Sequence, residues 1–179
     1  MFDEVQSGVG RTGKMWGYEN LSIEPDGFTL AKGLGGGHAI GALLVKEKAN
    51  IFSPGDHAST FGGNPFACKA ALTVLEEISK RNLLKNVTSR GKQLSDGFEQ
   101  LSNKFQDIII RKRGIGLIQG LVINEKYTDA KIITLKAFEK GLLVVPAGGN
   151  VVRIVPPLVI SSREVRILLK KLNSIFEEI

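Results

Sequence analysis

The sequence predicts a mixed α/β fold, in which the end of one α/β domain is followed by a small α+β domain. Short apolar segments typical of strands alternate with segments of helical periodicity along the whole chain. The polar stretch 79–86 between two consecutive helices is the expected domain boundary. We therefore expect the domains to cover residues 1–84 and 85–179, which is compatible with a chain of 179 residues.

The first expected domain contains two short strands and one long helix. Apolar runs predict strands at Phe28–Ala31 and Ala39–Val45. A helix is expected to begin at Pro65, because Asn64 is a favoured capping residue and proline is favoured at the first helical position. Apolar residues then recur at helical spacing as far as Ile78.

The beginning of the chain reads as the end of a strand. Only Phe2 provides an apolar side chain next to Asp3, whereas a buried parallel strand usually has four or more apolar residues. We therefore expect the chain to begin inside a domain. In the glycine-rich segment 7–27, Trp16 and Tyr18 are the expected anchors.

The second expected domain alternates helices with strands. The expected elements are a helix at 88–105, a strand at 115–123, a helix at 129–140, strands at 142–145 and 151–155, and a last helix from 161. Gly141 is a typical residue for ending the second of these helices. The segment 146–150 predicts a hairpin between the two short strands. Ser161 and Glu164 form the pattern of a capping box at the start of the last helix.

Composition favours a cytoplasmic enzyme. The chain is 42% hydrophobic and 23% charged, and its apolar runs are too short to span a membrane. The N-terminal residues lack the features of a signal peptide, and the single cysteine, Cys68, fits a reducing compartment. The net charge is +6, but the basic cluster 111–113 has few aromatic neighbours, so nucleic-acid binding is not indicated.

One lysine and one carboxylate suggest a site that could bind a cofactor. Lys32 follows an apolar run and precedes a glycine-rich bend, and Asp3 also ends a strand-like segment. Such a pair suits pyridoxal phosphate, whose aldehyde needs a lysine and whose ring nitrogen needs an acid. Gln6 can reach the phenolic oxygen of that cofactor, and Thr60 can donate its hydroxyl to the phosphate.

Each of these residues has a simpler interpretation when it is taken singly. Asp3 could be a loop or capping residue, and Lys32 could be a solvated surface lysine. The glycines 33–37 lack the spacing of a mononucleotide-binding loop, because the lysine precedes them. His38 and His57 have no cysteine or carboxylate partners at metal-binding spacing, so no metal site is indicated.

Three strings together resemble the class III, ornithine-type aminotransferases. They are Asp3-Glu4-Val5-Gln6-Ser7-Gly8-Val9-Gly10-Arg11-Thr12-Gly13, Pro25-Asp26-Gly27-Phe28-Thr29-Leu30-Ala31-Lys32-Gly33-Leu34-Gly35-Gly36-Gly37 and Ser59-Thr60-Phe61-Gly62-Gly63-Asn64-Pro65. The strings occur in the family's order and spacing. The resemblance implies the C-terminal part of a fold-type I pyridoxal-phosphate transferase, with the end of the large cofactor domain at 1–84 and the small domain at 85–179.

The resemblance also implies a role for each candidate residue. Asp3 pairs with the pyridine nitrogen, Gln6 lies at the phenolic oxygen, and Lys32 is the catalytic lysine that binds the cofactor covalently. Thr60 reaches the phosphate of the partner subunit's cofactor, which implies a homodimer. Arg153 binds a substrate α-carboxylate, or it is a surface-strand arginine.

Within the family, the strings 35–37, 55–60 and 147–153 most resemble members that act on N-acetylornithine. The implied reaction transfers the side-chain amino group of N-acetylornithine to 2-oxoglutarate, in arginine biosynthesis. The alternative amino donors are ornithine, succinylornithine and 4-aminobutyrate.

The resemblance covers only the C-terminal part of the family's length. The family's phosphate loop, its ring-stacking aromatic residue and the arginine for the distal carboxylate precede the position that corresponds to Asp3. We therefore expect this chain alone to bind the cofactor weakly. The alternative function is an inactive remnant that acts at most as a dimerising or binding module.

Overall fold

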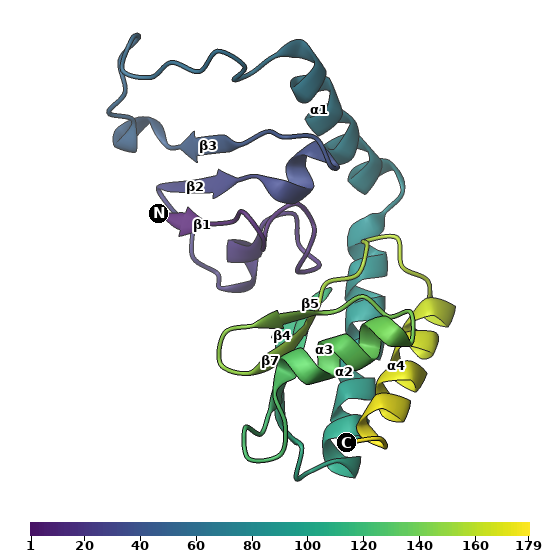
Figure 1. Ribbon diagram of the computed structural model, residues 1–179. Helices are drawn as coiled ribbons and strands as arrows, with labels where there is room; N and C mark the ends of the chain where they lie inside the picture. The colour runs from purple at the N-terminus through teal and green to yellow at the C-terminus, as the bar shows by residue number, and fades with distance from the viewer. The chain divides into compact units, whose positions relative to one another are not determined.

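The computed structural model describes residues 1–179, and the chain divides into two compact units (Figure 1). Unit 1 comprises Met1–Leu84 and unit 2 comprises Lys85–Ile179. None of the helices combines the length and the apolar character needed to cross a membrane.

Unit 1 consists of a three-stranded sheet, long connecting segments and one helix. Its elements are β1 (Phe2–Asp3), η1 (Gly17–Asn20), β2 (Gly27–Leu30), η2 (Lys32–Gly35), β3 (Ala42–Val45), η3 (Glu47–Ala49) and α1 (Pro65–Lys80). The strands lie in the order β1-β2-β3. Strand β1 runs parallel to β2, and β3 runs antiparallel to it. Strand β3 begins at Ala42, so it is shorter at its start than the strand predicted at 39–45.

The central strand β2 holds the small core of unit 1. Phe28 and Leu30 are buried, and the rings of Trp16 and Tyr18 lie 5.3 and 5.4 Å from the ring of Phe28. The expected anchoring by these two aromatic residues is confirmed. It fixes the long segment between β1 and β2 against the sheet.

Helix α1 begins as predicted and packs against η2. The Asn64 side chain accepts a hydrogen bond from the Ala67 N–H at 3.0 Å, and Pro65 occupies the first helical position. A Cβ placed on Gly36 would lie 2.9 Å from Cγ2 of Val74, and Gly36 has a φ of +60°. Glycine is therefore required where the bend after Lys32 meets the helix.

Unit 2 is an antiparallel sheet covered by three helices. Its elements are α2 (Leu83–Lys104, which begins in unit 1), β4 (Ile109–Ile115), β5 (Ile118–Ile123), α3 (Ala130–Glu139), β6 (Val145–Ala147), β7 (Val151–Ile154) and α4 (Ser162–Phe176). The strand order is β4-β5-β7-β6 (Figure 1).

The helices cover one face of this sheet. Leu121 and Ile123 of β5 and Val152 and Ile154 of β7 join one buried cluster with side chains from α2, α3 and α4. Because side chains alternate between the faces of a strand, the residues between these positions lie on the opposite face, away from the helices. That second face carries Arg153.

Three predicted boundaries in unit 2 are wrong. The expected strand at 115–123 begins only at Ile118, because Ile115 ends a preceding strand, β4, and Gly116 turns the chain with a φ of +55°. Helix α2 begins at Leu83 rather than at 88, and only two residues separate it from the end of α1. The first strand of the second hairpin is Val145–Ala147 rather than 142–145. The predicted capping box of α4 at Ser161 and Glu164 is confirmed. Asp129 caps α3, although the sequence was interpreted there only as the start of a helix.

Candidate active site

The parallel pairing of β1 with β2 brings Asp3 and the segment around Lys32 to one edge of the sheet. Phe2 pairs with Phe28 and Asp3 pairs with Thr29, and the Glu4 N–H donates to the Thr29 carbonyl at 3.0 Å. Asp3 is the last residue of β1, and Lys32 follows the end of β2 after one residue. Ligands of parallel sheets bind outside the carboxyl ends of the strands, so this edge is a candidate site.

Lys32 has an unusual backbone conformation. Its φ is +42°, in the left-handed region that side chains other than glycine and asparagine rarely adopt. The Leu34 N–H donates to the Ala31 carbonyl at 2.9 Å, and Leu34 is buried. The surrounding turn therefore holds Lys32 in this conformation, with the lysine exposed. Backbone strain of this kind is concentrated at functional sites.

Asp3 starts a tight turn that leads to Gln6. The Val5 N–H donates to Oδ1 of Asp3 at 2.9 Å, which bends the chain directly after β1. Asp3 is exposed and Gln6 is half-buried. The carboxylate, the amide and Lys32 thus all follow strand ends at the same sheet edge, as their predicted roles require.

Glu4, a buried carboxylate beside Asp3, was not predicted from the sequence to support the site. Its side chain accepts hydrogen bonds from the Ser7 hydroxyl at 2.7 Å, the Gly17 N–H at 2.8 Å and the Tyr18 N–H at 2.6 Å. The residue is only 3% exposed. A Cβ on Gly17 would lie 2.7 Å from Oε2 of Glu4, so that position suits glycine. Glu4 therefore holds both ends of the segment 7–18, which follows Asp3, in place.

The same segment partly buries a basic side chain. Burial lowers the pKa of the Arg11 guanidinium below its usual range. Nearby, the Asn20 side chain donates to the Thr12 hydroxyl at 3.0 Å, and Thr12 is buried. These contacts make the segment between β1 and β2 a defined structure rather than a loose loop.

Thr60 lies on a long exposed segment that connects η3 to α1. Residues 51–63 are all exposed and irregular. The Gly62 N–H donates to the Ser59 carbonyl at 3.3 Å, and Asn64 donates to the Phe61 carbonyl at 2.9 Å, so the turn is anchored to the start of α1. No hydrogen bond or ion pair joins Thr60 to Lys32 in the structure.

Arg153 belongs to unit 2 and lines a pocket there. It lies on β7, is half-buried, and pairs with Gly120 of β5. The pocket has a volume of about 260 Å³ and lies on the sheet face away from the helices. A guanidinium in such a position can bind a carboxylate through two parallel hydrogen bonds.

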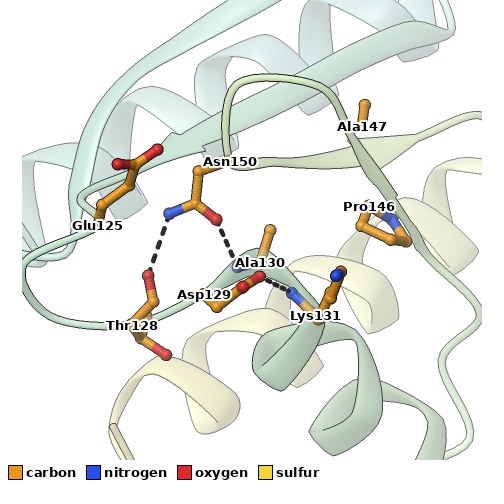
Figure 2. Close-up of a pocket in the computed structure, with 8 residues that line it drawn as sticks. All are labelled: Glu125, Thr128, Asp129, Ala130, Lys131, Pro146, Ala147 and Asn150. Carbon is orange, nitrogen blue, oxygen red and sulfur yellow. Dashed lines mark hydrogen bonds between the residues drawn. The ribbon is translucent and has the colours of Figure 1, made fainter.

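A second cavity, of about 400 Å³, lies at the start of α3 (Figure 2). Asn150 organises it: its amide accepts from the Ala130 N–H at 2.7 Å and donates to the Thr128 carbonyl at 3.0 Å. Asp129 caps the Lys131 N–H at 2.7 Å. These polar groups already form hydrogen bonds with one another. We therefore interpret the residues around the cavity as structural, because their hydrogen bonds hold the hairpin before Arg153 in place.

The donor set at the sheet edge of unit 1 fits pyridoxal phosphate. An exposed lysine, an exposed carboxylate and a half-buried amide follow the ends of adjacent parallel strands. An amine for the aldehyde, an acid for the ring nitrogen and a donor for the phenolic oxygen are the groups that this cofactor needs.

Comparison with known proteins agrees with this arrangement. Residues 1–176 match the family model "Aminotransferase class-III". The acetylornithine aminotransferase of Prochlorococcus marinus subsp. pastoris is 78% identical over 178 residues, which is 99% of this chain and 43% of that protein. The acetylornithine aminotransferase of Parasynechococcus marenigrum is 57% identical over 180 residues, which is all of this chain and 43% of that protein.

Solved structures show the same fold. An acetylornithine aminotransferase from Elizabethkingia anophelis has a TM-score of 0.89 at 33% identity, covering 98% of this chain and 45% of that one. An ornithine aminotransferase from Toxoplasma gondii, described with partial occupancy of PLP at its active site, has a TM-score of 0.90 at 31% identity, covering 97% of this chain and 42% of that one. The predicted fold class, that of the pyridoxal-phosphate-dependent transferases, is confirmed.

The chain spans about 43% of the length of the curated relatives it matches. The family match, in contrast, covers nearly all of this chain and includes both the strand ends of unit 1 and the sheet of unit 2. The chain therefore belongs to the class III aminotransferases, a pyridoxal-phosphate-dependent family.

Proposed function

We propose that this chain carries the cofactor-binding lysine of an aminotransferase that transfers the side-chain amino group of N-acetylornithine to 2-oxoglutarate. The products are N-acetylglutamate semialdehyde and glutamate, in arginine biosynthesis. The observation that carries the proposal is the parallel register of β1 and β2, which sets Asp3 and the turn of Lys32 at one sheet edge.

In this mechanism, each residue at the edge has a separate task. Bound pyridoxal phosphate supplies an electron-withdrawing ring. The Asp3 carboxylate would keep a proton on the ring nitrogen, and the Gln6 amide would donate to the phenolic oxygen. Lys32 would hold the aldehyde through Nζ, and as a free amine the same Nζ would accept and return a proton at the reacting substrate carbon.

Arg153 is proposed to bind the substrate carboxylate, and Thr60 is proposed to bind a cofactor phosphate across a homodimer. The exposure of Thr60 on an anchored turn supports contact with a second subunit. The identity of up to 78% to proteins named acetylornithine aminotransferase supports N-acetylornithine as the amino donor, rather than ornithine, succinylornithine or 4-aminobutyrate. A cytoplasmic location is proposed because the only cysteine, Cys68, is free.

The division into units supports the proposed domain assignment. Unit 1 would be the end of the large cofactor domain, and unit 2 would be the small α+β domain. The proposed cofactor residues Asp3, Gln6, Lys32 and Thr60 all belong to unit 1, and Arg153 belongs to unit 2.

The decisive test is covalent capture of the cofactor. The chain is mixed with pyridoxal phosphate, reduced with borohydride, digested and analysed by mass spectrometry. We expect the reduced adduct on Lys32 and its loss in Lys32→Ala, whereas the exposed-lysine control Lys14→Ala keeps it. An adduct spread over several lysines, or one that persists in Lys32→Ala, would contradict the proposal.

A turnover assay tests the substrate assignment. With 2-oxoglutarate as acceptor, N-acetylornithine should give a larger kcat/KM than ornithine, succinylornithine and 4-aminobutyrate. A preference for another of these amines would keep the family mechanism and reject the proposed donor. If Lys32 forms the adduct but no amine is turned over, the chain is a binding module without activity of its own.

A further inference from the structure

Helix α3 exposes apolar side chains on the side that points away from the core of unit 2. One side of the helix packs into the buried cluster of this unit. On the other side, Ile132 is 48%, Leu135 is 64% and Phe138 is 67% exposed. We call these three residues the α3 face. A helix that is apolar on all sides is normally covered on all sides, so the α3 face is a candidate contact surface.

The other two helices of unit 2 have no such face. No large apolar residue of α2 is exposed, and α4 exposes only Ile167, by 45%. The neighbours of Ile167 at helical spacing are all charged: Arg163, Glu164, Lys170 and Lys171. A single exposed apolar residue is ordinary on a protein surface. Three of them on one side of a helix of 10 residues form a continuous apolar surface.

The charged residues of α3 and its C-cap form two groups. Lys136 and Lys140 lie toward α4, where both form ion pairs with Glu178, at 3.9 and 2.5 Å. Lys131 and Glu139 lie beside the α3 face instead. Both are exposed, and neither takes part in an ion pair within the chain. The α3 face therefore offers one unpaired cation and one unpaired anion to a partner.

Lys131, Leu135 and Glu139 form a row that is complementary to itself. Rows of residues at i and i+4 are the ridges through which helices most often pack, with about 50° between their axes. In an antiparallel pair of α3 helices centred on Leu135, each charged residue lies four residues, or about 6 Å, from the centre. Lys131 of one copy then lies beside Glu139 of the other, at both ends of the contact. A parallel pair would place like charges together.

The two remaining apolar side chains suit the same arrangement. Ile132 and Phe138 flank the row, three residues before and three residues after Leu135, so a twofold axis sets each beside its counterpart in the second copy. The apolar centre leaves water while the charged ends stay solvated, as in other interfaces. One helix face buries less than the roughly 1,200 Å² of a stable complex. We therefore expect association only at high protein concentration.

We propose that the α3 face is a self-association surface, on which a second copy of this chain docks antiparallel and pairs its Glu139 with Lys131. The surface belongs to unit 2, whereas Thr60, which is proposed to act across a homodimer, belongs to unit 1. The inference goes beyond the proposed function, because none of the proposed cofactor or substrate residues belongs to the α3 face.

Sedimentation of the full chain without cofactor, from micromolar to millimolar concentration, measures the association. Leu135→Lys is compared with Ile167→Lys, which places the same charge at an exposed apolar position of α4. We expect Leu135→Lys to weaken association at least about tenfold, because the charge lies at the centre of the contact. Ile167→Lys should leave the affinity within about twofold of the wild type.

Exchange of the two charges tests both the partner and the antiparallel arrangement. Lys131→Glu and Glu139→Lys should each weaken association about fivefold, because each places like charges together at both ends of the contact. The double variant Lys131→Glu/Glu139→Lys again offers opposite charges to a second copy of itself, so it should recover the wild-type affinity. Circular dichroism checks that every variant is folded.

The inference is overturned if Leu135→Lys sediments as the wild type does at every concentration. It is also overturned if the double variant associates as weakly as the single variants, because the face would then fit a partner other than a second copy. A dimer formed through unit 1 alone would respond to none of these changes. The measurements contain no cofactor, so their outcome is independent of the adduct at Lys32.

Discussion

At the scale of single residues, Glu4 is the strongest structural determinant of the candidate site. Its buried carboxylate is the acceptor for the Ser7 hydroxyl and for the N–H groups of Gly17 and Tyr18. Glu4→Ala leaves these donors without that acceptor, so we expect the free energy of unfolding to fall by about 3 kcal/mol. Urea titration followed by the emission of Trp16, which lies in the same segment, measures the change.

Glu24→Gln is the control for this prediction. Glu24 forms an ion pair with Lys46 at 3.1 Å, but its side chain is 77% exposed. Exposed ion pairs contribute at most about 1 kcal/mol, so this variant should unfold close to the wild type. Equal effects of Glu4→Ala and Glu24→Gln would mean that Glu4 does not organise the segment.

The backbone conformation of Lys32 should lower the stability of the folded chain, although its side chain is proposed to bind the cofactor. Its left-handed φ of +42° is strained for lysine and for alanine, but not for glycine. Lys32→Gly should therefore be about 1 kcal/mol more stable than Lys32→Ala, although both variants lose the cofactor adduct. Chemical denaturation of the two variants without cofactor gives the difference. A more stable Lys32→Ala would show that the turn relaxes to an ordinary conformation.

At the scale of elements, helices with capping signals were predictable and exposed strands were not. Asn64 and Ser161 mark helix starts by their own side chains, and the structure confirms both caps. Strand β4 was missed because the edge of the sheet exposes most of its residues, so it lacks the apolar alternation of a half-buried strand. Its basic side chains were read only as a charge cluster.

The early start of α2 has a different cause. Asn82 adopts a φ of +51° between the two helices, so the chain turns within two residues and begins a new helix at once. Asparagine tolerates this conformation better than most residues, but it does so equally in loops. The sequence therefore indicates a break at this point without revealing how short the break is.

Close packing of α2 against the β4–β5 turn gives a test within one helix. A Cβ on Gly91 would lie 2.6 Å from the Gly116 carbonyl oxygen, which is backbone, whereas a Cβ on Gly97 would meet the tip of the Leu169 side chain. Side chains can move, but this turn is also held by Gln119, which donates to the Gly91 and Gly116 carbonyls at 2.8 and 2.7 Å.

We therefore expect Gly91→Ala to lower the free energy of unfolding by about 2 kcal/mol. Gly97→Ala should cost less than half as much, because the helix-propensity gain of about 1 kcal/mol is common to both variants, whereas the Leu169 side chain can move and the Gly116 backbone cannot. Far-UV circular dichroism during urea titration measures both. The packing argument fails if the two variants have the same midpoint.

The capping box of α4 should make that helix sensitive to acid. The Ser161 N–H donates to the Glu164 carboxylate at 2.7 Å, and hydrogen bonds from Ser161 hold the pKa of Glu164 below its usual range. A lowered pKa means that the stabilisation is complete above the ordinary glutamate pKa and is lost as the pH falls through the folded value. The wild type should thus exceed Glu164→Gln in stability at pH 7 but not at about pH 2.

Glu139→Gln, at an exposed position outside any capping box, is the control. The stability difference between this variant and the wild type should not be confined to pH 7. Thermal unfolding of the three proteins at both pH values measures the effect. A Glu164→Gln difference that is the same at both pH values would show that the carboxylate charge does not matter to the cap.

At the scale of the whole molecule, the candidate site depends on contacts that the sequence does not display. The placement of Asp3 and Lys32 at strand ends could be predicted, because each closes a strand-like segment and belongs to a string that resembles the family. Glu4 could not, because its partners lie as far as 14 residues away and a glutamate beside an aspartate carries no signal of burial. The pairing of Gly120 with Arg153 likewise exists only through strand register.

The two units differ greatly in the size of their cores. Unit 2 contains one cluster of 19 buried apolar side chains, drawn from all its helices and from three of its strands, with Phe98 and Phe176 among the largest. In unit 1 only seven apolar residues are buried, and Ile51 and Phe61 are more than 80% exposed. Because burial of apolar surface is the main stabilising contribution, unit 2 should be the more stable of the two.

This difference predicts two separate unfolding transitions in urea. Trp16, the only tryptophan, reports on unit 1, and far-UV circular dichroism reports mainly on α2, α3 and α4 of unit 2. We expect the Trp16 emission to change at a lower urea concentration than the circular dichroism. The double variant Trp16→Phe/Phe105→Trp moves the probe beside Phe176 in the unit 2 core, and its emission should then follow the circular dichroism. Coincidence of the original two transitions would mean that the chain unfolds as one cooperative unit, despite its two cores.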